Sequence, residues 1–211
     1  MRNSLPLCFV CFTVAVIATP TQAQYIFTDV DGSQQCDAAD IVQHGDGRLD
    51  VWIDTTQNGF GEPAVCATGE DLTISSYEVV MVLEQVTATG WENARPEFNQ
   101  SLGFQTEGRY VRAGYTSPGA TTHLAPGLYK LGTLLTHWDS GCPMVVPVTS
   151  ALFSAKKHST EFWSRCLGLD GDYTIRLGDE FSDTCGSIVP CDAAEDLGTT
   201  WGKIKKHYLP K

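Results

Sequence analysis

The longest β-prone run in this chain of 211 residues is ISSYEVVMVLEQV, which spans residues 74–86. Successive side chains of a strand point to opposite faces, so every second residue of this run shares a face. One face holds Tyr77, Val79, Met81 and Leu83. The other face holds Glu78, Val80, Val82 and Glu84. A strand of this length predicts a protein built on β-sheet.

Shorter segments with the same character lie on both sides of this run, and Gly, Pro, Asn and Asp separate them. The further strand candidates are residues 49–54, 102–105, 109–113, 128–138, 144–148, 151–154 and 173–177. Helical patterns are confined to residues 38–43 and 201–208. Many short strands without the spacing of parallel βαβ units predict an all-β fold, an antiparallel β-sandwich.

The N-terminus has the pattern of an export signal. Arg2 precedes a mostly apolar run at residues 5–17, and Ala23 supplies a small residue at a cleavage point. The run is too short to span a bilayer comfortably, although an uncleaved anchor is the competing interpretation. We therefore expect residues 1–23 to be a signal peptide, and the rest of the chain to be secreted without membrane insertion.

The charge balance is strongly acidic. The chain has 14 Lys and Arg against 25 Asp and Glu, which gives a formal net charge of −11. Such a surface repels nucleic acid and anionic lipid headgroups, and it suits divalent cations. We expect no nucleic-acid partner.

The cysteines favour disulfides. Two of the eight fall within the predicted signal, and an even number in the exported remainder is typical of oxidised secreted domains. We expect Cys185 and Cys191 to pair locally, because they enclose a short loop, and Cys66 and Cys166 are further candidates. The competing interpretation is a zinc site, for which the six cysteines after the predicted signal lack any C-x-x-C spacing.

The most specific motif is the acidic loop DVDGSQQCDAAD, residues 29–40. Calcium takes roughly six to eight oxygen ligands, and a loop of about twelve residues supplies them from its first, third, fifth, seventh, ninth and last positions. Those positions hold Asp29, Asp31, Ser33, Gln35 (through its backbone carbonyl), Asp37 and Asp40. The sequence therefore predicts a Ca²⁺ site here. The competing interpretation is an acidic surface turn that binds nothing.

This loop resembles a single repeat of the dockerin-type calcium loops, which end in Asp as this one does at Asp40. It departs from that pattern at Gln34, where Gly usually permits a sharp turn, and at Cys36, where Ile or Val is usual. A dockerin has two such repeats and this sequence has one. The resemblance thus implies calcium binding that stabilises the N-terminal segment, rather than docking to a cohesin.

A second loop, residues 54–62, also carries oxygen-bearing side chains at alternate positions. Asp54, Thr56, Asn58 and Glu62 supply them, and Gly59 stands at the sixth position. No acidic residue occupies the twelfth position, so a plain turn between strands competes with a second cation site.

Trp91, Glu92 and Asn93 are the candidate residues for sugar binding. An exposed indole ring can stack on a sugar ring while neighbouring amides and carboxylates bind hydroxyls, whereas packing in the core is the alternative for Trp91. No catalytic arrangement is evident: the chain has no G-x-S-x-G motif, and its five histidines form no H-x-x-x-H pair. We therefore expect a protein without catalytic activity.

The remaining motifs resemble those of cohesin-type modules. PGLYKLGT, residues 126–133, is similar to the P-G-x-Y-x-(I/L)-(A/G)-x-(L/I) strand of these modules. The resemblance implies a cohesin-like or immunoglobulin-like β-sandwich over residues 49–190, after a calcium-loop segment at 24–48 and before a tail at 191–211. It implies a role in extracellular adhesion or assembly, with another secreted protein as partner. A carbohydrate-binding module that recognises extracellular polysaccharide is the alternative, and an extracellular hydrolase is the second alternative.

Overall fold

The computed structural model describes residues 24–57, 61, 63–64, 72–120, 122–164, 173–176, 182–185 and 187–188. Its strands are β1 (Gln24–Asp29), β2 (Gly45–Asp54), β3 (Ser76–Glu84), β4 (Thr87–Asn93), β5 (Gln100–Glu107), β6 (Tyr110–Thr116), β7 (Leu128–Trp138), β8 (Met144–Val148), β9 (Ser150–Phe153), β10 (Lys156–Ser159), β11 (Glu161–Ser164), β12 (Tyr173–Arg176), β13 (Ser182–Cys185) and β14 (Ser187–Ile188). One short 3-10 helix, η1 (Pro118–Ala120), follows β6. The all-β prediction is confirmed.

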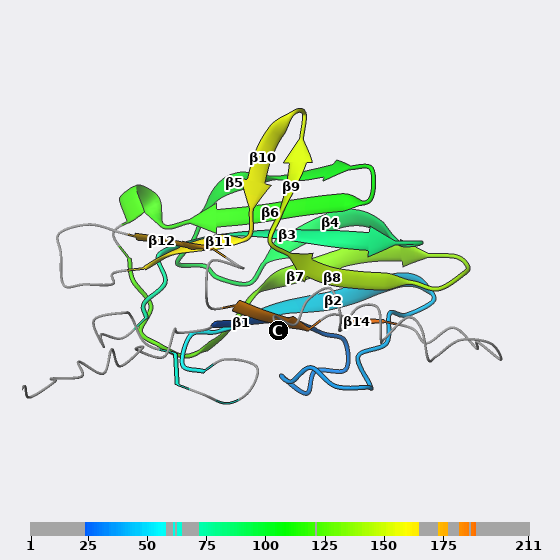
Figure 1. The fold of residues 1–211 in the computed structure, drawn as a ribbon, viewed down its shortest axis with the longest axis horizontal. Coiled ribbons are helices and arrows are strands. Elements are labelled where there is room, and N and C mark those ends of the chain that lie inside the picture. The colour runs from blue at the N-terminus through cyan, green and yellow to red at the C-terminus, as the bar shows by residue number, and fades with distance from the viewer. Residues whose placement is uncertain are drawn as a thin grey trace, which may run out of the picture.

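All the strands except β9 and β10, which pair with each other, form two packed sheets, which Figure 1 shows one above the other. The first sheet has the order β13-β1-β2-β7-β4, and only its β1–β13 pair is parallel. The second has the order β12-β11-β3-β6-β5, with β8 also paired to β3 and β14 paired to β8. The prediction of an antiparallel β-sandwich is therefore confirmed.

Strand β3 is central to the second sheet. It pairs with β6 on one side, whereas on the other side its first residues pair with β11 and its later ones with β8. Thr160 lies where the partner changes: its hydroxyl accepts a hydrogen bond from Val80 N–H at 2.9 Å and donates one to the Val148 carbonyl oxygen at 2.5 Å. This fully buried side chain thus satisfies backbone groups that the change of partner would leave unpaired.

The core lies between the two sheets. The β3 face that contains Tyr77, Val79, Met81 and Leu83 is at most 5% exposed, and it packs against apolar side chains of β2 and β7. Full burial of one such aliphatic side chain is worth about 1.5–3 kcal/mol, so this face is a main source of stability. The alternation in residues 74–86 therefore identified an inner face of the sandwich.

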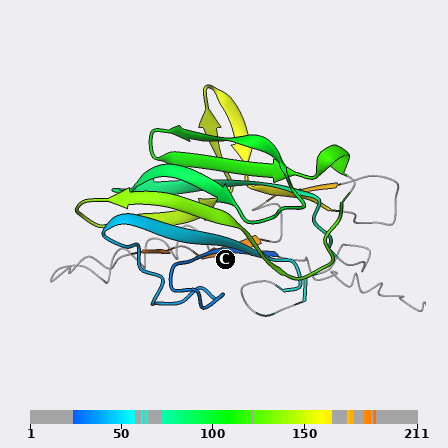
Figure 2. The ribbon, with the colours of Figure 1, turned by 180° about the vertical axis from the view of Figure 1, so that it is seen from behind.

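The β9–β10 hairpin leaves the second sheet between β8 and β11 and projects past β5, as Figures 1 and 2 both show. Its Phe153 side chain is only 1% exposed, and the centroid of the Phe153 ring lies 5.9 Å from the guanidinium carbon of Arg112 on β6. The Glu78 carboxylate on β3 accepts a hydrogen bond from Arg112 at 3.1 Å and lies 2.8 Å from His158 Nδ1 on β10. These contacts hold the hairpin against the outer face of the sheet.

Residues 38–43 do not form the expected helix, and that prediction is wrong. The segment makes a single turn, in which Asp40 N–H donates to the Asp37 carbonyl oxygen at 3.3 Å. The Asp40 carboxylate accepts the N–H groups of Val30 and Asp37, so this buried side chain ties the segment to the residue after β1 instead of lying on the face of a helix.

The predicted loop segment 24–48 is continuous with the sandwich, since β1 and the first residues of β2 both belong to the first sheet. Residues 1–23, the predicted signal, and residues 191–211, the predicted tail, lie outside the described residues. Within the described part of the chain, no helix is long and apolar enough to cross a membrane.

The hairpin anchor gives a testable prediction. Replacing Arg112 with Ala leaves Glu78 without its cation in a site where both side chains are only 13% exposed, so we expect the free energy of unfolding to fall by about 3 kcal/mol. Arg109→Ala on the same strand is the control, because the Arg109–Glu84 pair is exposed to solvent and should contribute little. Urea unfolding followed by tryptophan fluorescence measures both, and equal effects of the two substitutions would contradict the anchoring role.

Candidate functional sites

The acidic loop after β1 brings together three of the six predicted calcium ligands. Each of Asp29, Asp31 and Asp40 offers a carboxylate oxygen, and these oxygens all lie within 4.8 Å of one another. Asp29 and Asp40 are 1% and 2% exposed, whereas Asp31 is exposed. Carboxylates at this separation form a pocket of hard oxygen atoms, the ligand type that Ca²⁺ prefers.

Hydrogen bonds from the backbone fix the two buried carboxylates. Asp29 accepts the N–H groups of Gly32 at 2.7 Å and of Gln34 at 2.9 Å. Asp40 accepts the N–H groups of Val30 at 2.7 Å and of Asp37 at 2.9 Å. The loop therefore folds around its first and last acidic side chains, and these hydrogen bonds order both carboxylates without a bound ion.

Gln34 adopts the conformation that the motif requires at its sixth position. Its φ is 61°, in the left-handed region where Gly is usual, and Gly32 has a φ of 81°. A non-glycine residue in this region costs about 1–2 kcal/mol, so the loop must hold Gln34 there through other contacts. The bond from its N–H to Asp29 is one such contact.

The electrostatics of the cluster are unfavourable without a cation. Burial, followed by the nearby charges of Asp29 and Asp31, raises the pKa of the Asp40 carboxyl above its ordinary value, against the two backbone hydrogen bonds that lower it. The pKa of Asp31 is lowered instead, because Ser33 donates hydrogen bonds to its exposed carboxylate. A divalent cation would relieve the repulsion that Asp40 experiences.

The structure does not bring Asp37 into this cluster. Its carboxylate is exposed and accepts the Ala39 N–H at 2.6 Å. Ser33 and Gln35 are also exposed, and the Ser33 hydroxyl donates to the Gln35 carbonyl oxygen at 3.3 Å. The predicted ligand roles of these three residues stay predictions.

The second candidate loop, residues 54–62, is described only in part. Asp54 is 5% exposed, and its carboxylate accepts hydrogen bonds from the N–H of Thr56 at 2.8 Å and from the hydroxyl of Thr56 at 2.6 Å. Asn58, Gly59 and Glu62 lie outside the described residues. A second cation site there stays a prediction.

The candidate sugar-binding residues have packing and hydrogen-bonding contacts within the sandwich. Trp91 packs against the core, and a Cβ atom at Gly132 would lie 2.2 Å from its ring, so the glycine makes room for the indole. The Asn93 amide donates to the carbonyl oxygens of Arg95 and Phe98. Glu92 is exposed and forms an ion pair with Arg48. The structure therefore does not present Trp91 as an open flat ring, and sugar binding by this trio stays a prediction.

Cys36 and Cys142 are both disulfide-bonded. Of the predicted disulfide residues, Cys185 ends β13, whereas Cys66, Cys166 and Cys191 lie outside the described residues. The predicted pairings among these four cysteines stay predictions.

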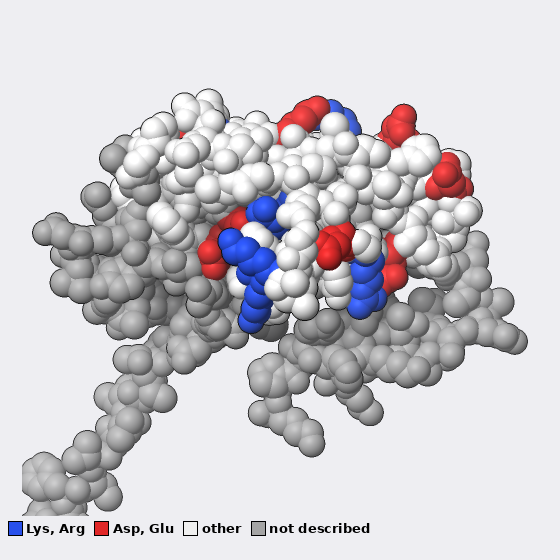
Figure 3. Space-filling model, turned by 90° about the horizontal axis from the view of Figure 1, so that it is seen from above, with Lys and Arg blue, Asp and Glu red and all other residues white. Residues whose placement is uncertain are grey.

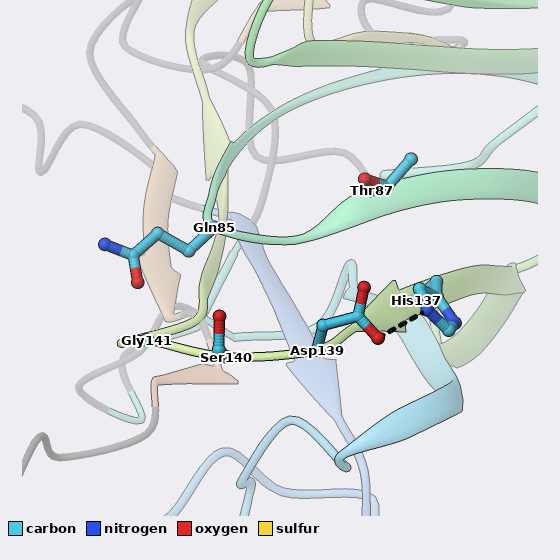
Figure 4. A pocket seen from close by; sticks show the side chains of 6 residues that line it. All are labelled: Gln85, Thr87, His137, Asp139, Ser140 and Gly141. Atoms are coloured by element: carbon cyan, nitrogen blue, oxygen red, sulfur yellow. Dashed lines mark hydrogen bonds and ion pairs between the residues drawn. The ribbon is translucent and has the colours of Figure 1, made fainter.

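A cleft of about 440 Å³, which no sequence motif predicted, lies at one end of the sandwich (Figure 4). The β3–β4 turn, the start of β4, the end of β7 and the turn after it form its walls. It is lined by Gln85, Thr87, His137, Asp139, Ser140 and Gly141. The Gln85 side chain accepts the N–H of Cys142 and so ties the two turns together.

His137 lies between two carboxylates in this cleft. Its Nδ1 is 2.6 Å from Asp46 Oδ1, and its Nε2 is 2.9 Å from Asp139 Oδ1, the contact drawn in Figure 4. Both ring nitrogens can donate to carboxylates only when the imidazole is protonated, so these two partners raise the pKa of His137. In that protonated form the ring has no lone pair with which to accept a further proton.

Comparison with known proteins places the chain near one group of structures. No protein-family model matches the chain, and no curated protein matches its sequence. The structural neighbours are cohesin modules. They share its β-sandwich fold, and they are the kind of module that the sequence resembles.

Three of these neighbours illustrate the extent of the similarity. The seventh ScaB type I cohesin of Pseudobacteroides cellulosolvens has a TM-score of 0.48 at 6% identity, with 83% of this chain and 96% of that chain covered. The sixth cohesin of scaffoldin B from Acetivibrio cellulolyticus, in complex with a Cel5 dockerin mutant, has a TM-score of 0.48 at 8% identity, with 81% and 99% covered. A non-cellulosomal cohesin of Archaeoglobus fulgidus has a TM-score of 0.44 at 10% identity, with 89% and 99% covered. No residue role is carried over from any of them.

The His137 contacts predict a specific titration. We expect the pKa of His137 to lie above 6.5, and Asp139→Asn to move it back toward 6.5 because one carboxylate partner is lost. The stabilisation from these contacts is fully present below pH 6.5 and is lost as the pH rises through the raised pKa. Ring-proton NMR shifts as a function of pH measure this, with Ser140→Ala as the control that should leave the pKa unchanged. A His137 pKa at or below 6.5 in the unsubstituted protein would contradict the geometry.

Proposed function

We propose that this chain is a secreted β-sandwich module, stabilised by one calcium ion, that serves in extracellular adhesion or assembly and has no catalytic role. The observation that carries the proposal is the Asp29, Asp31 and Asp40 cluster at the end of β1. Two of its carboxylates are buried, and backbone hydrogen bonds hold both of them in place. A loop built around buried negative charges needs a positive counterpart, and Ca²⁺ suits both its oxygen ligands and its length.

The extracellular part of the proposal rests on the apolar N-terminal run and on the cysteines. Disulfides persist in oxidising compartments, and Cys36, within the calcium loop itself, is disulfide-bonded. Calcium-dependent stability also suits the extracellular space, where calcium is abundant enough to fill sites of modest affinity.

Another secreted protein is the partner class that the geometry favours over a polysaccharide. The best sugar-stacking candidate, Trp91, is half-buried and packs against the core, and its neighbour Asn93 is hydrogen-bonded within the sandwich. The acidic surface of the chain suits a partner with complementary charge.

Calcium binding is tested by thermal unfolding. We expect added calcium to raise the melting temperature, and Asp31→Asn to remove most of that rise. Asp31 is the informative position because it is exposed, and Asn keeps an oxygen that accepts the Ser33 N–H at 2.9 Å while losing the charge. The stability in chelator should therefore stay unchanged, whereas Asp29→Ala and Asp40→Ala should also lower it by removing acceptors of backbone N–H groups.

The control for this experiment is Glu84→Gln, which removes one exposed negative charge from β3, outside the acidic loop. It should keep most of the gain from calcium. Equal melting temperatures in calcium and in excess chelator for the unsubstituted protein would rule out the calcium-stabilised module.

Reduction tests the oxidised state. We expect a reducing agent to lower the melting temperature, because breaking disulfides of a secreted domain typically costs about 2–5 kcal/mol. Thiol labelling of the exported protein, denatured without reduction, should find its cysteines blocked. Labelling of Cys36 or Cys142 under those conditions would contradict the oxidised assignment.

A further inference from the structure

The β9–β10 hairpin projects from the second sheet, on the side of the molecule opposite the acidic loop (Figures 1 and 2). The two-residue turn Ser154-Ala155 joins its strands. Residues directly opposite each other on paired strands share a face, and successive residues alternate between faces. Phe153 lies against the sheet, so Leu152 and its cross-strand partner Lys157 are on the face of the hairpin that points away from the sheet.

The hairpin differs from the rest of the described structure in its cations. Lys156 and Lys157 are exposed, and among the described residues neither forms an ion pair. Every other Lys or Arg whose side chain the structure describes is paired with a carboxylate of the chain: Arg48, Arg95, Arg109, Arg112 and Lys130. Among these side chains, the positive charge that is open to a partner is therefore on the hairpin.

Leu152 adds an apolar group to this charge. Its side chain is 62% exposed, the highest value among the exposed large apolar side chains of the described residues. A single exposed apolar side chain is ordinary by itself. This one lies directly opposite an unpaired cation, Lys157, on a projecting hairpin, so a partner can contact an apolar group and a charge together.

The turn of the hairpin is held in one conformation. Ser154 and Ala155 have φ values of 49° and 65°, which a type I′ turn requires, although neither is the Asn or Gly that is usual there. The Glu107 carboxylate on β5 accepts the Ser154 N–H, and the Gln105 side chain donates to the Ser154 hydroxyl at 3.4 Å. A surface that is ordered before it binds loses less conformational entropy on binding.

The charge of the whole chain limits which anions can bind the hairpin. Figure 3 looks onto the side toward which the hairpin points, and Lys and Arg stand there in small groups, with Asp or Glu beside several of them. The net charge is −11, so the rest of the surface repels a long polyanion such as nucleic acid, a sulfated polysaccharide or an anionic bilayer. A short acidic segment avoids most of this repulsion, because charges more than about 10 Å away are largely screened at about 0.1 M salt.

We propose that the hairpin tip, defined as Leu152, Lys156 and Lys157, binds a short acidic segment of another secreted protein, and that this segment also contains an apolar side chain. Carboxylates of the segment pair with the two ammonium groups. Its apolar side chain covers Leu152 and removes that side chain from water. The charges set which segments can bind, and the apolar contact adds affinity.

This contact gives the proposed function a partner of stated chemistry, and it rests on that function only for the extracellular setting. Three contacting side chains bury less than the roughly 1,200 Å² of a stable interface, so binding should be weak and reversible. The acidic loop lies on the opposite side of the molecule and takes no part. Binding measured in chelator therefore succeeds or fails independently of the calcium site.

Fluorescence anisotropy in chelator tests this contact with three labelled peptides, DELFED, DEGGED and SQLFQS, and with protein from about 5 µM to about 2 mM. DELFED should bind most tightly, because DEGGED lacks the apolar side chains and SQLFQS lacks the charges. The double substitution Lys156→Gln/Lys157→Gln should weaken DELFED binding at least about fivefold, since two charge pairs are lost. Leu152→Ser should remove the advantage of DELFED over DEGGED.

Arg48→Gln on β2 is the matched control for Lys157→Gln, because each removes one exposed positive charge. The control should change DELFED binding by less than about twofold, and circular dichroism checks that each variant is folded. A protein that binds no DELFED up to about 2 mM overturns the proposal, as do equal effects of the two substitutions. Tighter binding of a heparin oligosaccharide or of phosphatidylserine vesicles than of DELFED also overturns it, since the hairpin would then serve polyanions.

Discussion

The buried carboxylates of Asp29 and Asp40 are the constraint on which the N-terminal half of the structure depends. Asp29 ends β1 opposite Asp50 of β2, and the loop between these strands folds back so that Asp40 lies beside it. Each carboxylate accepts hydrogen bonds from two backbone N–H groups. These bonds fix the path of a loop that has almost no regular structure. The same burial disfavours unneutralised charge, so the order of this segment and the proposed affinity for calcium would have one cause.

In the second sheet, one strand, β3, pairs with three others. Strand β3 changes partner from β11 to β8, and Thr160 satisfies the backbone at the change. The β9–β10 hairpin connects β8 to β11 in the chain. The Glu78–Arg112 pair helps to hold this hairpin against the outer face of the sheet. This arrangement covers part of the outer face near β3 and β6, and Ser154 at the hairpin turn contacts the side chains of Gln105 and Glu107 on β5. The molecule thus has the acidic loop on one side and the edge strand β5 on the other.

The sequence predicts the local part of this structure well. The periodicity of residues 74–86 identified an inner face, and the predicted bounds of β7 and β8 agree with the structure. The oxygen pattern of residues 29–40 predicted six ligands, and three of them, all aspartates, lie together in the structure. The cleft around His137 could not be predicted, because its contact with Asp46 joins residues 91 positions apart through the pairing of β2 with β7. Trp91 was ambiguous because the space for its ring is provided by Gly132, whose role becomes visible only once β4 pairs with β7.

The central claim is that the loop after β1 is a calcium site rather than a neutralised acidic turn. Isothermal titration of calcium chloride into metal-free protein tests it most directly, because it reports both stoichiometry and affinity. One ion per chain, bound more weakly as the pH falls toward the raised pKa of Asp40, is the result that the structure predicts. The absence of saturable binding at extracellular calcium concentrations, about 10⁻³ M, would contradict it.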